Sequence, residues 1–193
     1  MSKKIRTRKK KNPRKVTLKS LENAALFYLQ RYATSTENLR RVLMRRVDRS
    51  ARAHGTDRVE GACFVDQILK RYCKAKLLDD TSYAAARAAS MRRRGASGRA
   101  IRSNLRAKGV KNETIDMVLD EQLKDSPATE VKAASNYCRR RRLGPWRTVD
   151  RKEQREKDIA SLGRQGYSVD VALRVIDAVS IEVLEMEIAS GSV

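Results

Sequence analysis

Apolar side chains recur along nearly the whole chain at spacings of three and four residues. The first such segment places them at Leu21, Ala25, Tyr28, Leu29 and Tyr32. This spacing puts them on one face of an α-helix, where they can pack against a core. No segment of useful length alternates apolar and polar residues in the manner of a half-buried β-strand. The pattern therefore predicts an all-α protein.

Capping residues divide the first part of the chain into three predicted helices. Thr17 is placed to cap the first, and Thr34 forms a capping box with Glu37 that opens the second. Residues 49–61 are polar and contain two glycines, so they predict a loop before the third helix. The apolar residues of the second and third helices are Leu39, Val42, Leu43 and Val47, followed by Val65, Ile68, Leu69, Tyr72 and Cys73.

Shorter predicted helices follow residue 78. Asp79 and Asp80 cap the next one, which begins near Tyr83, is rich in alanine and ends at Arg94 and Gly95. Leu143–Gly144–Pro145 and Gly166 end later helices, because proline and glycine interrupt the helical pattern. The remaining apolar stripes are Ile101 and Leu105; Ile115, Val118, Leu119 and Leu123 after a cap at Asn112; Val131, Ala134 and Cys138 after Ser126–Pro127; Ile159 and Leu162 from about Asp150; and Ala172, Val175, Ile176 and Val179 after Ser168.

An internal repeat organises these helices. Leu105, Gly109 and Val118–Leu119 recur as Leu162, Gly166 and Val175–Ile176, each at an offset of 57 residues. The first part of the chain has a related pattern with 12 additional residues, which match the polar segment 49–61. We therefore expect an elongated tandem array of three three-helix repeats, with helical repeats over 17–78, 79–125 and 126–180.

The charge of the chain indicates an anionic partner. The 193 residues contain 44 Lys or Arg and 23 Asp or Glu, which gives a formal net charge of +21. Nine of the basic residues fall in 1–16, where no acid occurs, and this composition predicts a disordered basic arm. The remaining residues keep a surplus of +12, enough to attract DNA, RNA or an acidic protein surface. The sign reverses after Arg174, so 181–193 are expected to form an acidic C-terminal tail.

Several classes of protein are excluded by what the sequence lacks. The longest uncharged apolar run, Ala24–Leu29, has six residues, whereas a membrane helix needs about 20. No apolar signal-peptide region follows the basic N-terminus, so we expect a cytoplasmic protein. Cys63, Cys73 and Cys138 show no metal-ligand spacing, and a cytoplasmic location favours reduced thiols, so no metal site or disulfide is expected.

Four stretches carry a pattern that can be compared with known families. They are Ala25–Arg31 (ALFYLQR) leading into Glu37–Arg41 (ENLRR); Leu77–Ala84 (LLDDTSYA); Arg94–Gly95 with Ile101–Arg102, Leu105 and Lys108–Val110 (KGV); and Gly166–Ser168 (GYS) with the helix after it. In these stretches the chain resembles the RecX family of bacterial recombination regulators. The chain departs from the family pattern at Lys76, where glycine is usual, and at Asn104, where glutamate is usual.

The resemblance implies both a fold and a function. It implies an all-α protein of tandem three-helix repeats that binds the RecA–DNA filament. Such a protein would restrain the extension, ATPase and co-protease activity of RecA in recombination and the SOS response. It would work as a monomer, without chemistry or cofactor of its own.

Basic side chains are the candidate contacts with the RecA filament or with DNA phosphates, because guanidinium groups fork onto carboxylates and phosphates. Each of them can instead be a solvated residue that stabilises its own helix end. The candidates are Arg40, Arg41, Arg45, Arg92, Arg93, Arg94, Arg99, Arg102, Lys108, Arg139, Arg140, Arg141 and Arg142.

Two other functions compete with regulation of RecA as explanations of the sequence. A non-specific DNA- or RNA-binding protein that acts without RecA is favoured by the basic arm, but the few aromatic residues argue against base stacking as its binding mode. An enzyme is disfavoured, because the sequence has no phosphate-binding glycine loop and no Ser/His/Asp set. The paired Asp79 and Asp80 are explained as helix caps, and His54 lies in a polar segment.

Overall fold

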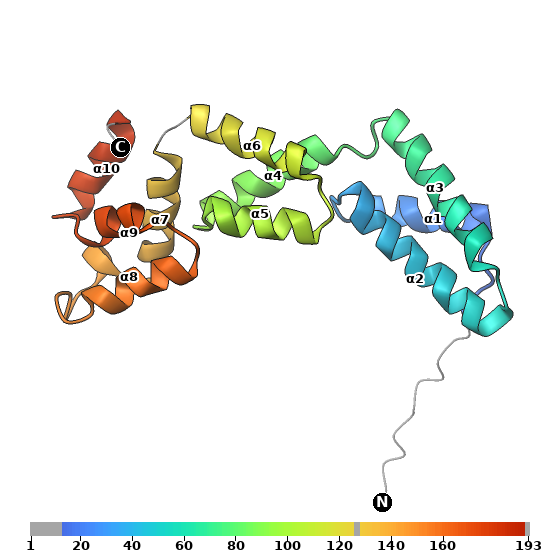
Figure 1. Ribbon diagram of the computed structural model, residues 1–193, viewed down its shortest axis with the longest axis horizontal. Coiled ribbons are helices and arrows are strands. Elements are labelled where there is room, and N and C mark those ends of the chain that lie inside the picture. Colours follow the sequence, from blue (N-terminus) through green and yellow to red (C-terminus); the bar gives the residue numbers. More distant parts are fainter. Residues whose placement is uncertain (1–12, 126–127, 192–193) are drawn as a thin grey trace, which may run out of the picture. The chain divides into compact units, whose positions relative to one another are not determined.

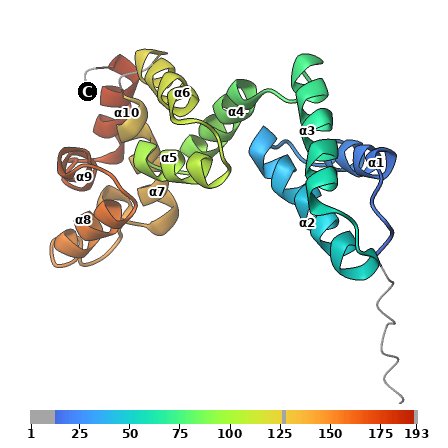
Figure 2. The same cartoon turned by 45° about the vertical axis from the view of Figure 1, so that its right-hand side comes forward.

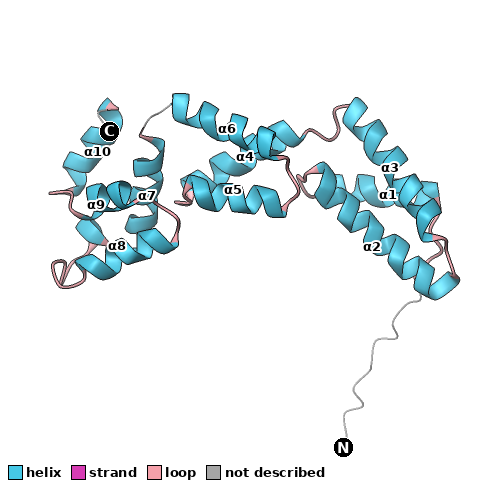
Figure 3. Cartoon of the chain, in the orientation of Figure 1, coloured by secondary structure: helices cyan, strands magenta, loops and turns pink. Residues whose placement is uncertain are grey.

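A computed structural model describes residues 13–125 and 128–191, and every regular element in these two ranges is helical (Figures 1 and 3). The all-α prediction is confirmed. Contacts divide the chain after Leu78 into two compact units, and the second unit begins at Asp79. The elements are α1 (Leu18–Leu29), α2 (Thr36–His54), α3 (Arg58–Lys74), α4 (Asp80–Arg93), α5 (Gly98–Ala107), α6 (Asn112–Asp125), α7 (Thr129–Arg141), the 3-10 turn η1 (Gly144–Trp146), α8 (Arg155–Arg164), α9 (Val169–Ile176) and α10 (Ile181–Ser190).

The first unit packs α1, α2 and α3 around one apolar core (Figure 2). Leu43 of α2 and Ile68 of α3 are fully buried there. Val16 joins the same core, and its backbone N–H donates to Ser50 Oγ at 2.9 Å. The expectation of a disordered arm over 1–16 is therefore wrong for residues 13–16, which lie in defined positions, while residues 1–12 are outside the described part.

The loop expected over 49–61 is also wrong. Helix α2 continues to His54 and α3 begins at Arg58, so only a short turn around Gly55, with φ +65°, separates them. The segment is polar because one side of each helix faces solvent, and polarity alone does not exclude helix. Gly61 lies inside α3, where an added Cβ would come within 2.5 Å of Val47 Cγ1, so the glycine permits the close approach of α2.

Most predicted helix starts are confirmed by their caps. Thr17 Oγ1 accepts from Ser20 N at 3.2 Å, and Ser168 Oγ accepts from Val171 N at 3.3 Å. Asp79 caps α4, although α4 begins at Asp80 and not near Tyr83. The capping box at Thr34 is wrong, because Ser35 is the residue whose side chain accepts from Asn38 N. The predicted start at Ser126–Pro127 lies outside the described residues.

The offset of 57 residues between the second and third repeats is a structural repeat. Helix α5 shifted by 57 coincides with α8, and the first residue of α6 then coincides with that of α9. Both α5 and α8 end in the same turn, closed by Val110 N–H on Leu105 O at 3.1 Å and by Tyr167 N–H on Leu162 O at 3.2 Å. The two leucines are fully buried at matching positions.

The repeat is interrupted at one buried position. Asp158 occupies the place in α8 that Ile101 occupies in α5, and both side chains are buried. The Asp158 carboxylate accepts from Gly144 N at 2.9 Å and pairs with Arg147 at 2.7 Å. The helices α7, α8, α9 and α10 share one core and are called the third bundle. The Asp158 carboxylate therefore holds η1 and the segment after it against this bundle.

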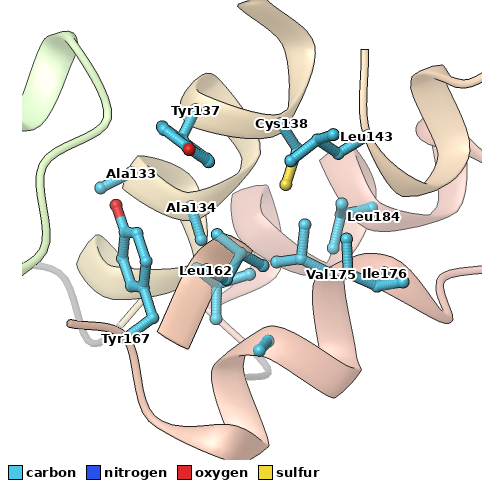
Figure 4. Close-up of a cluster of buried hydrophobic side chains, with 12 residues drawn as sticks. Ala133, Ala134, Tyr137, Cys138, Leu143, Leu162, Tyr167, Val175, Ile176 and Leu184 are labelled. Carbon is cyan, nitrogen blue, oxygen red and sulfur yellow. The ribbon is translucent and has the colours of Figure 1, made fainter. Parts of the chain in front are cut away.

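The third bundle has a fourth helix that the acidic sequence did not predict. The segment 181–193 was expected to be a tail, but Ile181–Ser190 form α10, and Leu184 is fully buried in the core (Figure 4). Its Glu185 and Glu187 pair with Arg139 and Arg174, which lie on other helices. Acidic residues that have no basic neighbours in sequence thus have them in space.

Left-handed turns join several helices. Lys76 adopts φ +57°, so this left-handed turn forms with a lysine in it. The helices α4, α5 and α6 share one core and are called the second bundle. Gly95, with φ +77°, lies where this bundle meets the third. An added Cβ at Gly95 would come within 2.5 Å of Tyr137 N on α7. Backbone conformation and close packing therefore both require glycine at this position.

Replacing Gly95 by alanine should lower the free energy of unfolding by about 2 kcal/mol or more, because the left-handed strain adds to the clash with α7. Gly163→Ala is the matched control. Gly163 lies inside α8 with nothing within 4 Å of the added Cβ, so this change should raise stability by about 0.5–1 kcal/mol. Urea denaturation measures both. Equal effects of the two substitutions would contradict the proposed packing at Gly95.

The three thiols should differ in reactivity. Burial raises the pKa of Cys138 to about 12, assisted by the charge of Asp158, and Figure 4 shows its sulfur pointing into the core. Cys63 is exposed and Cys73 is half-buried. At mildly alkaline pH an alkylating reagent should modify Cys63 in the folded protein and Cys138 only after unfolding, as mass spectrometry would show. Modification of both at one rate in the folded protein would contradict this packing.

Candidate functional site

Several of the predicted basic contacts already have an acidic partner. Arg40 pairs with Asp66 at 2.5 Å and Arg102 with Asp116 at the same distance. The other two such pairs are Arg41 with Glu37 and Arg139 with Glu185. All of these pairs are partly exposed, so each contributes about 1 kcal/mol or less to stability. An incoming carboxylate or phosphate must nevertheless compete with an acid that is already in place.

Arg92 has a different environment from the other predicted contacts. Only 8% of the residue is exposed, and its Nη1 lies 2.5 Å from Glu130 Oε1. The same carboxylate oxygen accepts from Gly98 N at 2.9 Å. One ion pair thus joins α4, α5 and α7, and Arg92 acts in packing the second bundle against the third. Arg92 is therefore not one of the exposed residues that could contact RecA.

Other predicted contacts remain on the surface. In the part of the chain that the structure describes, no acidic oxygen lies within 4.0 Å of the guanidinium groups of Arg45, Arg93, Arg94, Arg99, Arg140, Arg141 and Arg142, and all seven residues are exposed. Lys108 is half-buried at the end of α5, where its backbone N–H bonds to Asn104 O at 3.1 Å. These exposed guanidinium groups are the ones best placed to bind an external anion.

In the second unit, Arg93 lines a groove between α4 and α7. The groove has a volume of about 270 Å³, and its described lining residues include no Asp or Glu. Lys132 and Asn136 of α7 line it together with Arg93, and Arg92 forms part of its wall. We call it the α4–α7 groove. Lys132 was not predicted, although it lies one helical turn before Asn136 and two turns before Arg140, a spacing visible in the sequence.

The first unit has a larger groove between α1, α2 and the segment before α1. Its volume is about 480 Å³, and we call it the α1–α2 groove. Arg46 and Arg49 of α2 line it, as do Arg14 and Lys15. None of these four was among the predicted contacts, since the arginine run of α2 did not reveal which side of the helix meets α1.

Two aromatic residues of the first unit lie on its surface. Few aromatics occur in the sequence, but Phe27 and Tyr32 of α1 are 52% and 56% exposed. The guanidinium carbon of Arg31 lies 4.1 Å from the centroid of the Phe27 ring. Phe27 also lines the α1–α2 groove. Aromatic rings are therefore available for stacking on this unit.

The described residues point to binding of anions. Among them, no group of three or more His, Cys, Asp or Glu side chains is placed to hold a metal ion, and no helix is long and apolar enough to cross a membrane. His54 Nε2 contacts the backbone oxygen of Pro13 at 2.5 Å, and Cys138 is buried. What the exposed arginines offer is hydrogen bonding and charge for carboxylates and phosphates.

Known proteins with similar sequences identify the family. Residues 79–119 match the model of the second three-helix domain of RecX. The regulatory protein RecX of Myxococcus xanthus is 42% identical over 170 residues, which cover 87% of this chain and 90% of that protein. The chain belongs to the RecX family. The regulatory protein RecX of Agrobacterium fabrum is 30% identical over 156 residues, with 80% of each chain covered.

A solved structure supports the fold of this RecX-family chain. The crystal structure of a regulatory protein RecX matches with a TM-score of 0.62 at 23% identity, over 83% of this chain and 71% of that one. The helical repeat fold predicted from the sequence is thereby confirmed.

In this RecX-family chain the ion pair of Arg92 and Glu130 should contribute to stability. Arg92→Ala should lower the free energy of unfolding by about 2–3 kcal/mol, less than a fully buried pair would, because Glu130 is partly exposed. Arg93→Ala is the neighbouring control and should change stability by about 0.5 kcal/mol or less. Replacing both partners, Arg92→Met with Glu130→Leu, should recover part of the loss. Chemical denaturation tests all three, and equal values for Arg92→Ala and Arg93→Ala would exclude this packing role.

Proposed function

We propose that this chain inhibits RecA by binding the RecA–DNA filament and restraining its extension, ATPase and co-protease activity. Membership of the RecX family supports regulation of RecA in general. The observation that supports contact through the second unit is the α4–α7 groove, where basic side chains gather and the described lining residues include no acid. The protein would act in the bacterial cytoplasm as a monomer, without a cofactor.

The α4–α7 groove suits a partner that presents carboxylates. Arg93 and Arg94 lie at the C-terminal end of α4, and Arg140 lies two turns after Lys132 on α7. A guanidinium group that forks onto a carboxylate gains about 1.5–3 kcal/mol from each charged hydrogen bond. An acidic patch on the filament would therefore find several donors here that are not already neutralised.

Binding through several weak contacts fits the two-unit organisation. The first unit has one apolar core and the second has two, and both units expose basic side chains, so each unit can contact a polymeric target separately. Two linked sites on one target bind more tightly than either does alone, without a deep pocket. A repetitive filament presents many copies of the same surface, so both units can bind to it at once.

The test replaces Arg93 and Arg94 by glutamate and measures inhibition of the DNA-dependent ATPase of RecA. The loss of two charged contacts should raise the concentration for half-maximal inhibition about tenfold or more. The original candidate Arg92 is not replaced, since its change would disturb packing. Adding the protein to preformed and to growing filaments would distinguish disruption from capping.

The matched control is Lys152→Glu with Lys157→Glu, which makes the same change in net charge at exposed positions near and on α8. It should leave inhibition close to that of the unaltered protein. Glutamate at the end of α4 weakens the helix by about 0.3–1 kcal/mol per residue. Arg93→Gln with Arg94→Gln, together with thermal unfolding, therefore separates lost contact from lost fold. Equal inhibition by both charge-reversal proteins would exclude the α4–α7 groove as the RecA contact.

A further inference from the structure

The α1–α2 groove has two properties that the RecA proposal does not use. Its basic residues come from two segments, Arg46 and Arg49 from α2 and Arg14 and Lys15 from the stretch before α1. Among the lining residues that the structure describes, none is Asp or Glu. A concave surface lined by one sign of charge focuses its field and attracts polyanions. Its volume of about 480 Å³ is within the range of about 300–1,000 Å³ typical of ligand sites.

The wall of this groove is held in place by the fold. Val16 is buried in the core of the first unit, and its N–H donates to Ser50 Oγ at 2.9 Å. The Pro13 carbonyl contacts His54 Nε2 at 2.5 Å. Arg14 and Lys15 lie between these two attachments. The groove therefore has its own anchored basic wall.

An exposed aromatic ring lies in the same groove. Phe27 is 52% exposed although it is a large apolar residue, and it lines the groove from α1. The guanidinium carbon of Arg31 lies over one face of the ring, 4.1 Å from its centroid, and the residue still keeps 52% of its surface exposed. Leu26, its neighbour on α1, is 41% exposed but is not a lining residue. An exposed ring beside phosphate-binding groups is the combination that single-stranded nucleic acids use.

We propose that the α1–α2 groove binds single-stranded nucleic acid, with the phosphodiester backbone on Arg46 and Arg49 and an unpaired base stacked on Phe27. This site goes beyond regulation of RecA, because it needs only the bare strand. A duplex keeps its bases stacked inside the helix. It can therefore bind to the groove through its phosphates, but it has no unpaired base to stack on Phe27. Each stacked base adds affinity that does not depend on its sequence.

The decisive experiment compares ligands with and without bases on the full chain. Phe27→Ala should weaken binding of a twenty-nucleotide oligo(dT) about fivefold or more. It should leave binding of inorganic polyphosphate unchanged, because polyphosphate has no base to stack. Arg46→Gln with Arg49→Gln should weaken both ligands. Leu26→Ala is the control for loss of an exposed apolar side chain on α1 and should weaken neither.

A local probe is needed, because we expect a chain of net charge +21 to attract DNA at more than one place. Phe27→Trp keeps an aromatic ring at the site, and Trp146→Phe removes the other tryptophan, which is half-buried in the second unit. Oligo(dT) should then quench the fluorescence of the new tryptophan, and polyphosphate should not. Oligo(U) in place of oligo(dT) asks whether DNA or RNA is the tighter ligand.

The results that would overturn the proposal are specific. If Phe27→Ala binds oligo(dT) as tightly as Leu26→Ala does, no base stacks at this position. If oligo(dT) and polyphosphate affect the tryptophan equally, the groove binds phosphate alone. Inhibition of the RecA ATPase is measured separately on the same variants, so loss of the RecA function through the α4–α7 groove and loss of strand binding here are distinguishable.

Discussion

The structure depends on burying narrow leucine and isoleucine stripes in bundles of short helices. Helices of 8 to 19 residues can bury only one face each, and three or four of them are needed to close a core. Leu43 and Ile68 do this in the first unit, Leu105 in the second bundle and Leu162 in the third. Every other face is left to solvent, which is why a chain with 35% charged residues can still fold.

The arginines on these outer faces do three different things. Arg92 is buried against Glu130, and the half-buried Arg147 pairs with the buried Asp158, so both connect segments of the second unit. Others, such as Arg40, form exposed pairs that hold neighbouring helices together weakly. Only the remaining group is available to an external anion. The positive charge of the sequence therefore overstates how many arginines lack an acidic partner, and the ion pairs among the described residues distinguish the two kinds.

Much of the fold was predictable because its information is local. The period of the apolar residues, the caps at Thr17 and Asp79 and the repeat around Leu105 and Leu162 are all visible within short windows of sequence. Two of the predictions that were wrong, on Leu184 and Arg92, involve contacts distant in sequence. Leu184 is a core residue in a segment whose charge indicated a tail, and Arg92 meets Glu130 from another bundle. Candidate site residues were the least predictable, since an arginine alone gives no sign of whether an acid lies opposite.

A buried polar residue interrupts the internal repeat, and this limits which helices can be exchanged between the second and third bundles. Asp158 stands where Ile101 stands in the preceding bundle, and it is tolerated because Arg147 and the Gly144 amide satisfy it. A chimera in which α8 replaced α5 would bring a carboxylate into an aliphatic interior without that guanidinium. The two bundles share the spacing of their helices but are not interchangeable, so we expect a chain with exchanged helices to keep its helical content and lose the packing of its core.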